Sequence, residues 1–300
     1  MIIIGDSLVQ MNRHGQAGQP LLSPAFQGGR ELDIISSIIM GIIEGLTEFL
    51  PVSSTGHMIL TAHLLGLSED NESVKTFEVV VQLGAVLAVV VLYWNKFIDM
   101  FRFTGGTRSY SRRLNLGHIF LAMVPAVVIG LVFRDWIKAH LFGPETVLYS
   151  LVIGGILMIV AERWSQKSHR ITTHDVDDIS YKQAFVVGLF QILALWPGFS
   201  RSGSTISGGL FAGVSRVAAA EFTFLVSVPI MIGATGYDLY KSIDHLNGSD
   251  FPIFAIGFIA AFIVAMLAIK TFLSILKKLS LTVFAVYRFV LAAVFFIILM

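Results

Sequence analysis

Residues 44–57 read Glu-Gly-Leu-Thr-Glu-Phe-Leu-Pro-Val-Ser-Ser-Thr-Gly-His, a polar run inside an otherwise apolar chain. A second polar run, Pro-Gly-Phe-Ser-Arg-Ser-Gly-Ser-Thr, occupies residues 197–205. Polar groups at membrane depth are costly, and they survive mainly where they face a cavity and take part in chemistry or transport. The carboxylates, imidazole, guanidinium and hydroxyls of the two runs together are suited to handling phosphate.

The composition around these runs is that of a membrane protein. Of the 300 residues, 55% are hydrophobic and 14% are charged, whereas soluble chains carry about 25% charged residues. The net charge of +1 gives no indication of a nucleic-acid partner. The chain has no cysteine, which excludes disulfides and thiolate metal sites.

The apolar stretches fall into two length classes. Those long enough to cross a membrane lie at about 77–94, 117–134, 147–163, 217–240, 252–276 and 282–300. Residues 34–50 and 184–196 are apolar but short, and each leads into one of the polar runs. Another short apolar piece follows each run, at about 57–66 and 203–214. Such short segments predict re-entrant pairs rather than crossings.

The two halves of the chain resemble each other. Gly41-Ile42-Ile43-Glu44 aligns with Gly188-Leu189-Phe190-Gln191, and a proline opens each serine-rich loop. We therefore predict an all-α integral membrane protein with six transmembrane helices and two re-entrant helix-loop-helix pairs. A single membrane domain is expected over residues 31–300, with repeat one at about 34–163 and repeat two at about 184–300. Residues 1–30 are expected to be a mobile N-terminal extension.

The distribution of basic residues predicts the orientation of the spans. Twelve of the 21 Lys and Arg residues lie in the segments 95–116, 163–182 and 270–280, which should be cytoplasmic. The acidic segment 66–76 should then be external. With these assignments the first re-entrant pair enters from outside and the second from inside. The repeats are then inverted and their tips meet near the midplane, a layout typical of transporters.

Glu44 and Glu48 are candidate metal ligands. Residues four apart on a helix lie about 40° apart on one face. Two carboxylates so placed can hold a divalent cation, or one can act as a base while the other orients it. The alternative is a pair of helix-end carboxylates at the membrane interface.

The hydroxyls of Ser53, Ser54 and Thr55 are candidate phosphate ligands. Pro51 and Gly56 interrupt the helix here and expose backbone N–H groups that bind anions. His57 begins the next helix, and a sharp turn would bring its ring to Glu48. A lone histidine is more often structural, but here a catalytic role is favoured. The remaining histidines, namely His63, His118, His140, His169, His174 and His245, are interpreted as ordinary.

Arg201 carries a permanent charge in the second polar run, and a guanidinium matches phosphate oxygens. Its alternative role is an ion pair with Glu44 or Glu48, and the two roles are compatible. Weaker donors come from neighbouring hydroxyls, each of which alone is better explained by close packing: Ser200, Ser202, Ser204 and Thr205. Tyr287 and Arg288 are unusual within an apolar stretch, and snorkelling or an Asp238 partner is as good an explanation as function.

The two polar runs resemble the two signature motifs of the undecaprenyl pyrophosphate phosphatase family of the bacitracin-resistance type. The resemblance covers about residues 34–300, including residues 77–84 and 213–216. It implies a bacterial inner-membrane enzyme, with a divalent-metal requirement and an active site open to the periplasm. The family hydrolyses undecaprenyl pyrophosphate to undecaprenyl phosphate and inorganic phosphate, which recycles the lipid carrier of peptidoglycan synthesis. Bacitracin binds that diphosphate, so the enzyme confers resistance.

The resemblance maps the family's acidic motif onto Glu44 and Glu48, its Ser/His loop onto Ser54 and His57, and its basic loop onto Arg201. We expect the two carboxylates to hold Mg²⁺ or Ca²⁺. Three nucleophiles stay open. Ser54, with His57 or Glu48 taking its proton, is slightly preferred over His57 itself and over a metal-bound water. The expected substrate ligands are Arg201, Ser53, Thr55, Ser200, Ser202 and Thr205.

Two other classes of function fit the same sequence. A lipid-phosphate transporter or flippase is suggested by the inverted repeats and broken helices. A bacitracin-binding or scaffold protein without chemistry is the third class. The paired carboxylates favour the enzyme, because an anion transporter gains little from two carboxylates beside its anion. The expected partners are the lipid diphosphate and membrane lipid, and the assembly considered is a homodimer.

Overall fold

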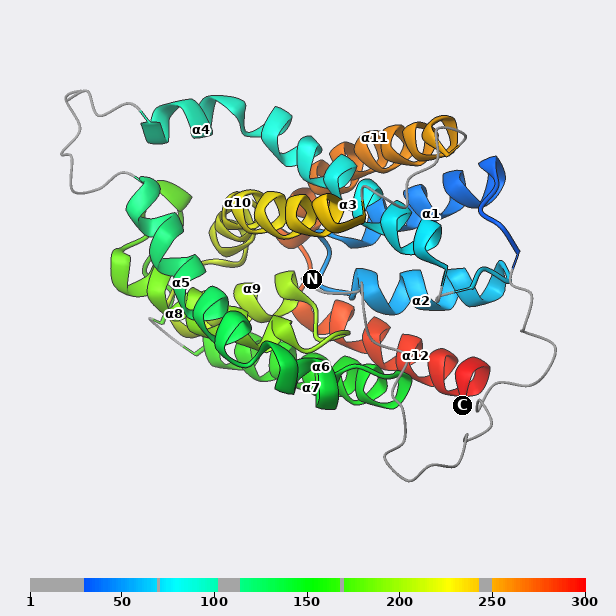
Figure 1. The fold of residues 1–300 in the computed structure, drawn as a ribbon. Coiled ribbons are helices and arrows are strands. Elements are labelled where there is room, and N and C mark those ends of the chain that lie inside the picture. Colours follow the sequence, from blue (N-terminus) through cyan, green and yellow to red (C-terminus); the bar gives the residue numbers. More distant parts are fainter. Residues whose placement is uncertain (1–29, 69–70, 102–113, 168–169, 243–249) are drawn as a thin grey trace.

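A computed structural model describes residues 30–68, 71–101, 114–167, 170–242 and 250–300. All the regular elements in these ranges are helices (Figure 1). Residues 1–29 of the expected extension lie outside the described ranges, as do most basic residues of segment 95–116.

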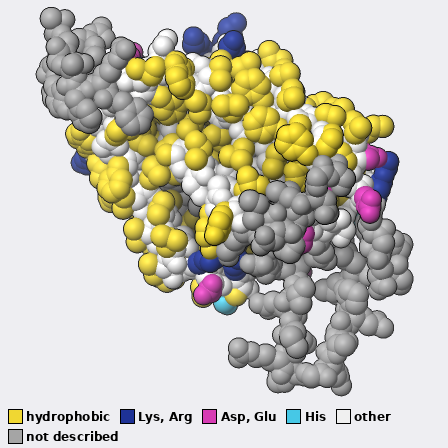
Figure 2. All heavy atoms as spheres, turned by 45° about the horizontal axis from the view of Figure 1, so that its top comes forward, with side chains coloured by type: hydrophobic (Ala, Val, Ile, Leu, Met, Phe, Trp, Pro, Cys, Tyr) yellow, Lys and Arg dark blue, Asp and Glu magenta, His cyan; other side chains and the backbone are white. Residues whose placement is uncertain are grey.

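Five helices are each long and apolar enough to cross a membrane. They are α3 (Glu72–Leu92), α7 (Pro144–Ser165), α10 (Arg216–Ser242), α11 (Phe251–Leu276) and α12 (Leu281–Leu299). A sixth span is possible if α5 (Leu116–Val132) and α6 (Arg134–Leu141), which meet at an angle of 77°, count together. Figure 2 shows hydrophobic side chains covering much of one face. The chain is a multi-pass membrane protein. Five of the six predicted apolar stretches coincide with the five long helices, and the stretch 117–134 coincides with α5, which is a span only together with α6.

Two short helical hairpins supply the rest of the fold. The first joins α1 (Ile34–Thr47) to α2 (Ser54–Leu64), and the second joins α8 (Tyr181–Gln191) and the 3₁₀ turn η4 (Ile192–Leu195) to α9 (Arg201–Phe211). In Figure 1 the first hairpin lies to the right and the second to the left. All four α-helices are shorter than the roughly 20 residues of a full crossing.

The open ends of the hairpins are closed in the same way. A backbone bridge joins Arg30 to Leu67 in the first hairpin, and another joins Thr173 to Val214 in the second. The last helix of each ends at a glycine of positive φ, Gly66 at 69° and Gly213 at 82°. Glycine is the usual residue in this conformation after a helix. The internal likeness expected from the sequence is therefore present at the level of turns.

Contacts between loops indicate which segments share an end of the molecule. Lys96 of α4 (Trp94–Phe101) donates to Asp177 of η3 (Val176–Asp178) at 2.6 Å. Arg216 donates to the carbonyl of Leu279 at 2.5 Å and lies 3.4 Å from Glu162. The first contact joins the basic segments 95–116 and 163–182. The second joins the segment 270–280 to the start of α10 and to the end of α7. At the start of α3, Ser73 lies 3.5 Å from Asp250, next to α11.

Each hairpin packs closely on a helix from the other half of the chain. A Cβ added to Gly45 of α1 would lie 2.6 Å from the carbonyl oxygen of Ala261 in α11. A Cβ added to Gly188 of α8 would lie 2.7 Å from the carbonyl oxygen of Ala122 in α5. Small residues allow such close approach where helices pack inside a membrane. The two halves are therefore interlocked.

The first loop is anchored in the core. Phe49 is buried, and its ring meets that of Phe224 in α10 edge-on with centroids 5.4 Å apart. At the other end of α1, Asp33 accepts a hydrogen bond from the backbone N–H of Ser36 at 2.7 Å. This bond lowers the pKa of the Asp33 carboxyl. The helix that carries Glu44 and Glu48 is thus fixed at both ends.

Candidate active site

The two loops turn through the same unusual conformation. Ser53 has φ 74° and ψ 93°, and Ser200 has φ 71° and ψ 113°. Across the described residues these are the two non-glycine positions with positive φ. Each side chain caps the helix that follows, accepting from Gly56 N and Gly203 N respectively at 3.2 Å. Backbone strain of this kind is concentrated at functional sites. Here the two strained serines cap the starts of α2 and α9.

A polar pocket lies between the two loops. Its lining comes from the first loop and from the segment around the second, namely Glu48, Ser53, Ser54, Thr55, Ala194, Trp196, Pro197, Gly198, Ser200 and Arg201. The loops also touch directly, because Ser202 donates to the carbonyl of Leu50 at 2.8 Å. Residues about 150 positions apart are therefore brought into one site.

Glu48 is the centre of this pocket. Its Oε2 accepts a hydrogen bond from the Ser54 hydroxyl at 2.6 Å, and its Oε1 accepts one from Arg201 Nη2 at 2.7 Å. The Glu48 and Arg201 side chains are only 7% and 9% exposed. The ion-pair alternative for Arg201 is present, with Glu48 as its partner. A buried charge pair costs desolvation, so it must be well hydrogen-bonded or serve a function.

Glu44 lies one turn before Glu48 and is not among the residues that line the pocket. Its side chain is fully buried, and neither carboxylate oxygen has a hydrogen-bond partner. It interacts electrostatically with Glu48 and Glu78. No group of three or more Asp, Glu or His side chains in the described ranges is arranged as a complete metal site. The two carboxylates alone would therefore form a partial ligand set.

His57 lies outside the pocket lining. Its Nδ1 is 2.7 Å from the carbonyl oxygen of Ser53, and its Nε2 is 2.7 Å from the hydroxyl of Tyr287. Because a carbonyl only accepts, Nδ1 carries the proton and Nε2 accepts from Tyr287 in the neutral ring. The expected approach of His57 to Glu48 gives no hydrogen bond between them, since Glu48 is bonded to Ser54 and Arg201 while His57 is bonded to Ser53 and Tyr287.

Other hydroxyls of the second run belong to α9 itself. Ser204 and Thr205 donate to the carbonyl of Arg201 at 2.9 and 2.7 Å, and Thr205 accepts from Thr223. With Ser202 they are fully or almost fully buried and absent from the polar lining. Of the expected hydroxyl ligands, Ser53, Thr55 and Ser200 line the pocket. Ser202 and Thr205 do not.

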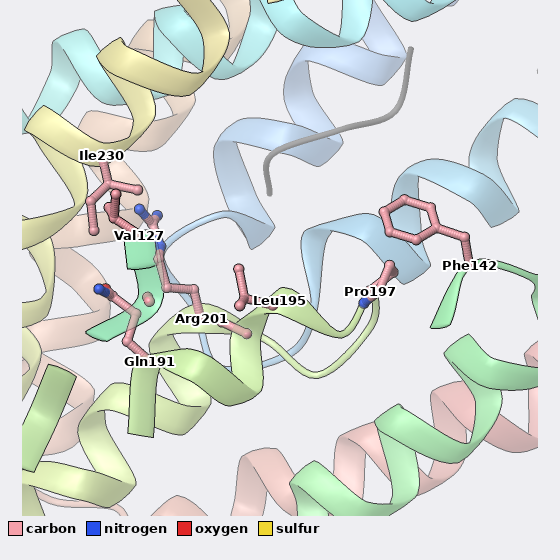
Figure 3. A pocket seen from close by; sticks show the side chains of 9 residues that line it. Val127, Phe142, Gln191, Leu195, Pro197, Arg201 and Ile230 are labelled. Atoms are coloured by element: carbon pink, nitrogen blue, oxygen red, sulfur yellow. The ribbon is translucent and has the colours of Figure 1, made fainter. Parts of the chain in front are cut away.

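An apolar hollow adjoins the polar pocket. It is lined by Ala126, Val127, Phe142, Gln191, Ala194, Leu195, Pro197, Arg201 and Ile230 (Figure 3). The space it encloses is about 520 Å³, a figure that includes the open space at its mouth. Ala194, Pro197 and Arg201 line both spaces. Arg201 therefore lies where an apolar chamber meets a polar one.

Arg288 is a buried residue whose place the sequence did not predict. It is 0% exposed and donates four hydrogen bonds to backbone carbonyls. The snorkelling explanation is wrong, because the guanidinium reaches inward to two carbonyls of the second loop. Those carbonyl bonds, rather than a pair with Asp238, account for four of its five N–H donors. The only signal in the sequence was a charge inside an apolar stretch.

Comparison with known families agrees with the likeness seen in the motifs. Residues 37–294 match the family model described as Bacitracin resistance protein BacA. The match spans both loops and nearly all of the helices from α1 to α12. A match over most of the chain cannot come from the two polar runs alone. The chain belongs to the bacitracin resistance protein BacA family.

Proposed function

We propose that this protein hydrolyses undecaprenyl pyrophosphate to undecaprenyl phosphate and inorganic phosphate, and so recycles the lipid carrier of cell-wall synthesis. Membership of the BacA family supports this reaction. The observation that carries it is the hydrogen-bonded Ser54–Glu48–Arg201 set, which lines the polar pocket and whose Arg201 also lines the apolar hollow. Bacitracin resistance follows because the drug binds the substrate that the enzyme removes.

The two adjoining spaces match the two parts of this substrate. The diphosphate would occupy the polar pocket, and the first apolar units of the lipid would occupy the hollow. Arg201 Nε is buried without a partner, so this donor remains for a phosphate oxygen. The starts of α2 and α9 add backbone N–H groups and the positive ends of two helix dipoles.

The hydrogen bonds of Glu48 support Ser54 as nucleophile with Glu48 as its base. The Ser54 oxygen would attack the terminal phosphorus while its proton passes to Glu48 Oε2. The bond from that phosphorus to the bridging oxygen breaks, and undecaprenyl phosphate leaves with the proton that Glu48 gives up. Water, deprotonated by Glu48, then attacks the phosphoserine, and Glu48 returns the proton to the Ser54 oxygen as inorganic phosphate leaves. Throughout, Arg201 would neutralise charge on the phosphoryl oxygens.

The ligand chemistry of Glu44 and Glu48 supports a divalent cation at this site. The orphaned oxygens of Glu44 and the neighbouring carboxylate of Glu48 are the hard ligands that Mg²⁺ and Ca²⁺ prefer. The protein would supply these two carboxylates, with the remaining ligands coming from substrate and water. Such an ion would add positive charge against the diphosphate.

We further propose that the hairpins are re-entrant and inverted, in a bacterial inner membrane with the site open to the periplasm. The bridge that closes the first hairpin, at Leu67, lies within the acidic segment 66–76. The bridge that closes the second, at Thr173, lies within a basic segment. The short hairpins and the positive-inside rule support opposite directions of entry.

The test is phosphate release from undecaprenyl pyrophosphate by purified protein in detergent, with Mg²⁺, with Ca²⁺ and with a chelator. We expect phosphate release to need metal. It should be lost in Arg201→Ala and kept in Arg163→Ala, a control at an exposed arginine. No release by folded wild type under any metal would reject the phosphatase and favour lipid-phosphate transport. Rapid quenching with labelled substrate should trap a phosphoserine, and a labelled histidine would contradict Ser54.

A further inference from the structure

Arg288 is a cation buried in the protein interior and outside the proposed chemistry. Its Nε donates to the carbonyl of Leu151 at 3.0 Å, and its Nη2 donates to that of Ser150 at 2.9 Å. The same Nη2 donates to the carbonyl of Gly198 at 3.1 Å, and Nη1 donates to that of Phe199 at 2.8 Å. The guanidinium thus joins α7 to the second loop from a position on α12.

Three successive carbonyls of the second loop are held from one side. Pro197 O accepts from the Ser150 hydroxyl at 2.5 Å, and Gly198 O and Phe199 O accept from Arg288. Ser200 and Arg201 follow directly. With these carbonyls held against α7 and α12, the strained turn at Ser200 and the start of α9 are fixed relative to the rest of the fold.

The neighbouring residues leave room for this arrangement. A Cβ added to Gly154 of α7 would collide with Nη2 of Arg288 and come within 2.9 Å of Phe199 O. Gly198 has φ 85°, and a Cβ there would collide with Ser150 Oγ. Burying a guanidinium is costly, and an apolar side chain of similar volume would pack two helices without that cost. The arrangement therefore needs an explanation beyond helix packing.

The residue before Arg288 reaches the other loop. The Tyr287 hydroxyl lies 2.7 Å from His57 Nε2, and the two rings are nearly parallel, with centroids 5.6 Å apart. His57 Nδ1 in turn lies 2.7 Å from the carbonyl of Ser53, the strained residue of the first loop. Consecutive residues of α12 are thus linked to both strained serines, one through a ring and one through two carbonyls.

We propose that Tyr287 and Arg288 are positioning residues that hold the two loops in the register that brings Ser54, Glu48 and Arg201 together. The inference rests on the proposed function for its kinetic readout and on the geometry for its binding readout. Arg288 fixes the loop that presents Arg201. Tyr287 fixes the His57 ring and, through it, the turn before Ser54. Neither side chain lines the polar pocket or the apolar hollow.

The experiment compares Arg288→Lys, Arg288→Met, Ser150→Ala and Tyr287→Phe with Leu291→Ala, a matched control. Leu291 is buried on the same helix, and its cluster includes Leu60 and Leu151 but no residue of the 48–54 or 196–201 loops. Each variant is measured for kcat, KM and thermal midpoint. Affinity for inorganic pyrophosphate with Mg²⁺ is measured by titration of the thermal midpoint, which requires no turnover.

Arg288→Met should lower kcat/KM about 100-fold, the loss that a displacement of about 1 Å can cause, and should weaken pyrophosphate binding about tenfold. Arg288→Lys, which keeps the charge but not the fork of donors, should fall between Met and wild type. Leu291→Ala should lower the thermal midpoint and leave kcat/KM and pyrophosphate affinity unchanged. Wild-type kcat/KM and affinity in Arg288→Met would overturn the proposal.

Milder variants keep the test decisive if Arg288→Met does not fold. Ser150→Ala removes one of the three carbonyl contacts, and Tyr287→Phe removes one hydroxyl from a half-exposed ring. Both should fold and should lower kcat/KM several-fold at an unchanged thermal midpoint, and wild-type values in both would overturn the proposal. If wild type hydrolyses no substrate, the proposed function fails while the pyrophosphate titration still reports on positioning.

Discussion

Glu48 divides its two oxygens between the halves of the chain, accepting from Ser54 with one and from Arg201 with the other. The Glu48 carboxylate is therefore hydrogen-bonded to both loops, and it keeps both bonds only when both loops are in place. Removing it would leave the Ser54 hydroxyl without its proposed base and the buried Arg201 guanidinium without its counterion. These two losses are separable, because one concerns rate and the other concerns stability.

The rate consequence is tested at Ser54. Ser54→Ala removes the proposed nucleophile and should lower kcat by at least about 100-fold, the lower range for loss of acid–base catalysis. Its fold should be retained, because the change removes one hydroxyl. Ser207→Ala is the control, since Ser207 is also a buried serine and donates to the carbonyl of Gly203, away from the polar pocket. Equal activity in the two variants would exclude Ser54 as nucleophile.

The stability consequence is tested with a double-mutant cycle. Glu48→Gln and Arg201→Gln each leave a buried charge unpaired, which should cost about 3–5 kcal/mol. The double variant removes both charges of the pair, so its loss of stability should be smaller than the sum of the losses in the two single variants. Denaturant or thermal unfolding of the four proteins measures this. Additive losses would mean that the pair at 2.7 Å contributes no coupling.

At the residue scale, the sequence predicted which side chains belong to the site better than it predicted their hydrogen-bond partners. Glu48, Ser54 and Arg201 stand out because charged and hydroxyl groups are rare in an apolar chain. The roles of His57 and Arg288 depend on a hydroxyl 230 positions away and on carbonyls as far as 138 positions away. Every residue has a carbonyl, so no sequence pattern marks those that accept from Arg288. Only the packing of α12 on α7 and α2 brings them together.

Among the elements, α1 is positioned by glycine packing on α11. A Cβ at Gly45 would lie 2.6 Å from Ala261 O and 3.0 Å from Ala265 N, both backbone atoms that cannot move independently. Gly45→Ala should therefore displace α1, destabilise the protein by about 1–3 kcal/mol and reduce activity, because Glu44 and Glu48 lie on either side of it. Unfolding and phosphate release measure both effects.

Gly233→Ala is the control for this prediction. Gly233 lies within α10, and a Cβ there meets nothing within 4 Å. The change should leave activity intact and should not destabilise, since alanine is the better helix former by about 1 kcal/mol. Full stability and activity in Gly45→Ala would mean that α1 does not depend on this close approach.

Hydropathy located the long helices to within a few residues but missed one bend. The stretch 117–134 was expected to be a single span, whereas α5 ends at Val132 and α6 leaves it at 77°. Arg134 and Asp135 begin α6, so this segment is too polar to continue through lipid. The mean hydropathy of a window of residues identifies an apolar helix, but it does not show in which direction the chain continues after that helix ends.

For the whole molecule, the proposed inverted arrangement of the two hairpins predicts which segments lie on each side of the membrane. The open end of the first hairpin should be external, and that of the second should be cytoplasmic. Because the chain has no cysteine, a single introduced thiol is a unique reporter. Leu64 and His174 are exposed and lie near the two open ends. Leu279 is exposed in the turn between α11 and α12, beside Arg216.

In intact cells, a membrane-impermeant maleimide should label Leu64→Cys, while His174→Cys and Leu279→Cys should react only after permeabilisation. The reason is electrostatic, since basic segments are retained in the cytoplasm during insertion. Labelling of Leu64→Cys and His174→Cys from the same side would rule out inversion and make the hairpins parallel. Both hairpins would then enter the membrane from the same face. The contact between the turns at Ser53 and Ser200 would then need another explanation than two tips that meet end to end. Opposite sides would instead explain why two hairpins with the same turns form one pocket, because only tips that enter from opposite faces meet end to end within the membrane.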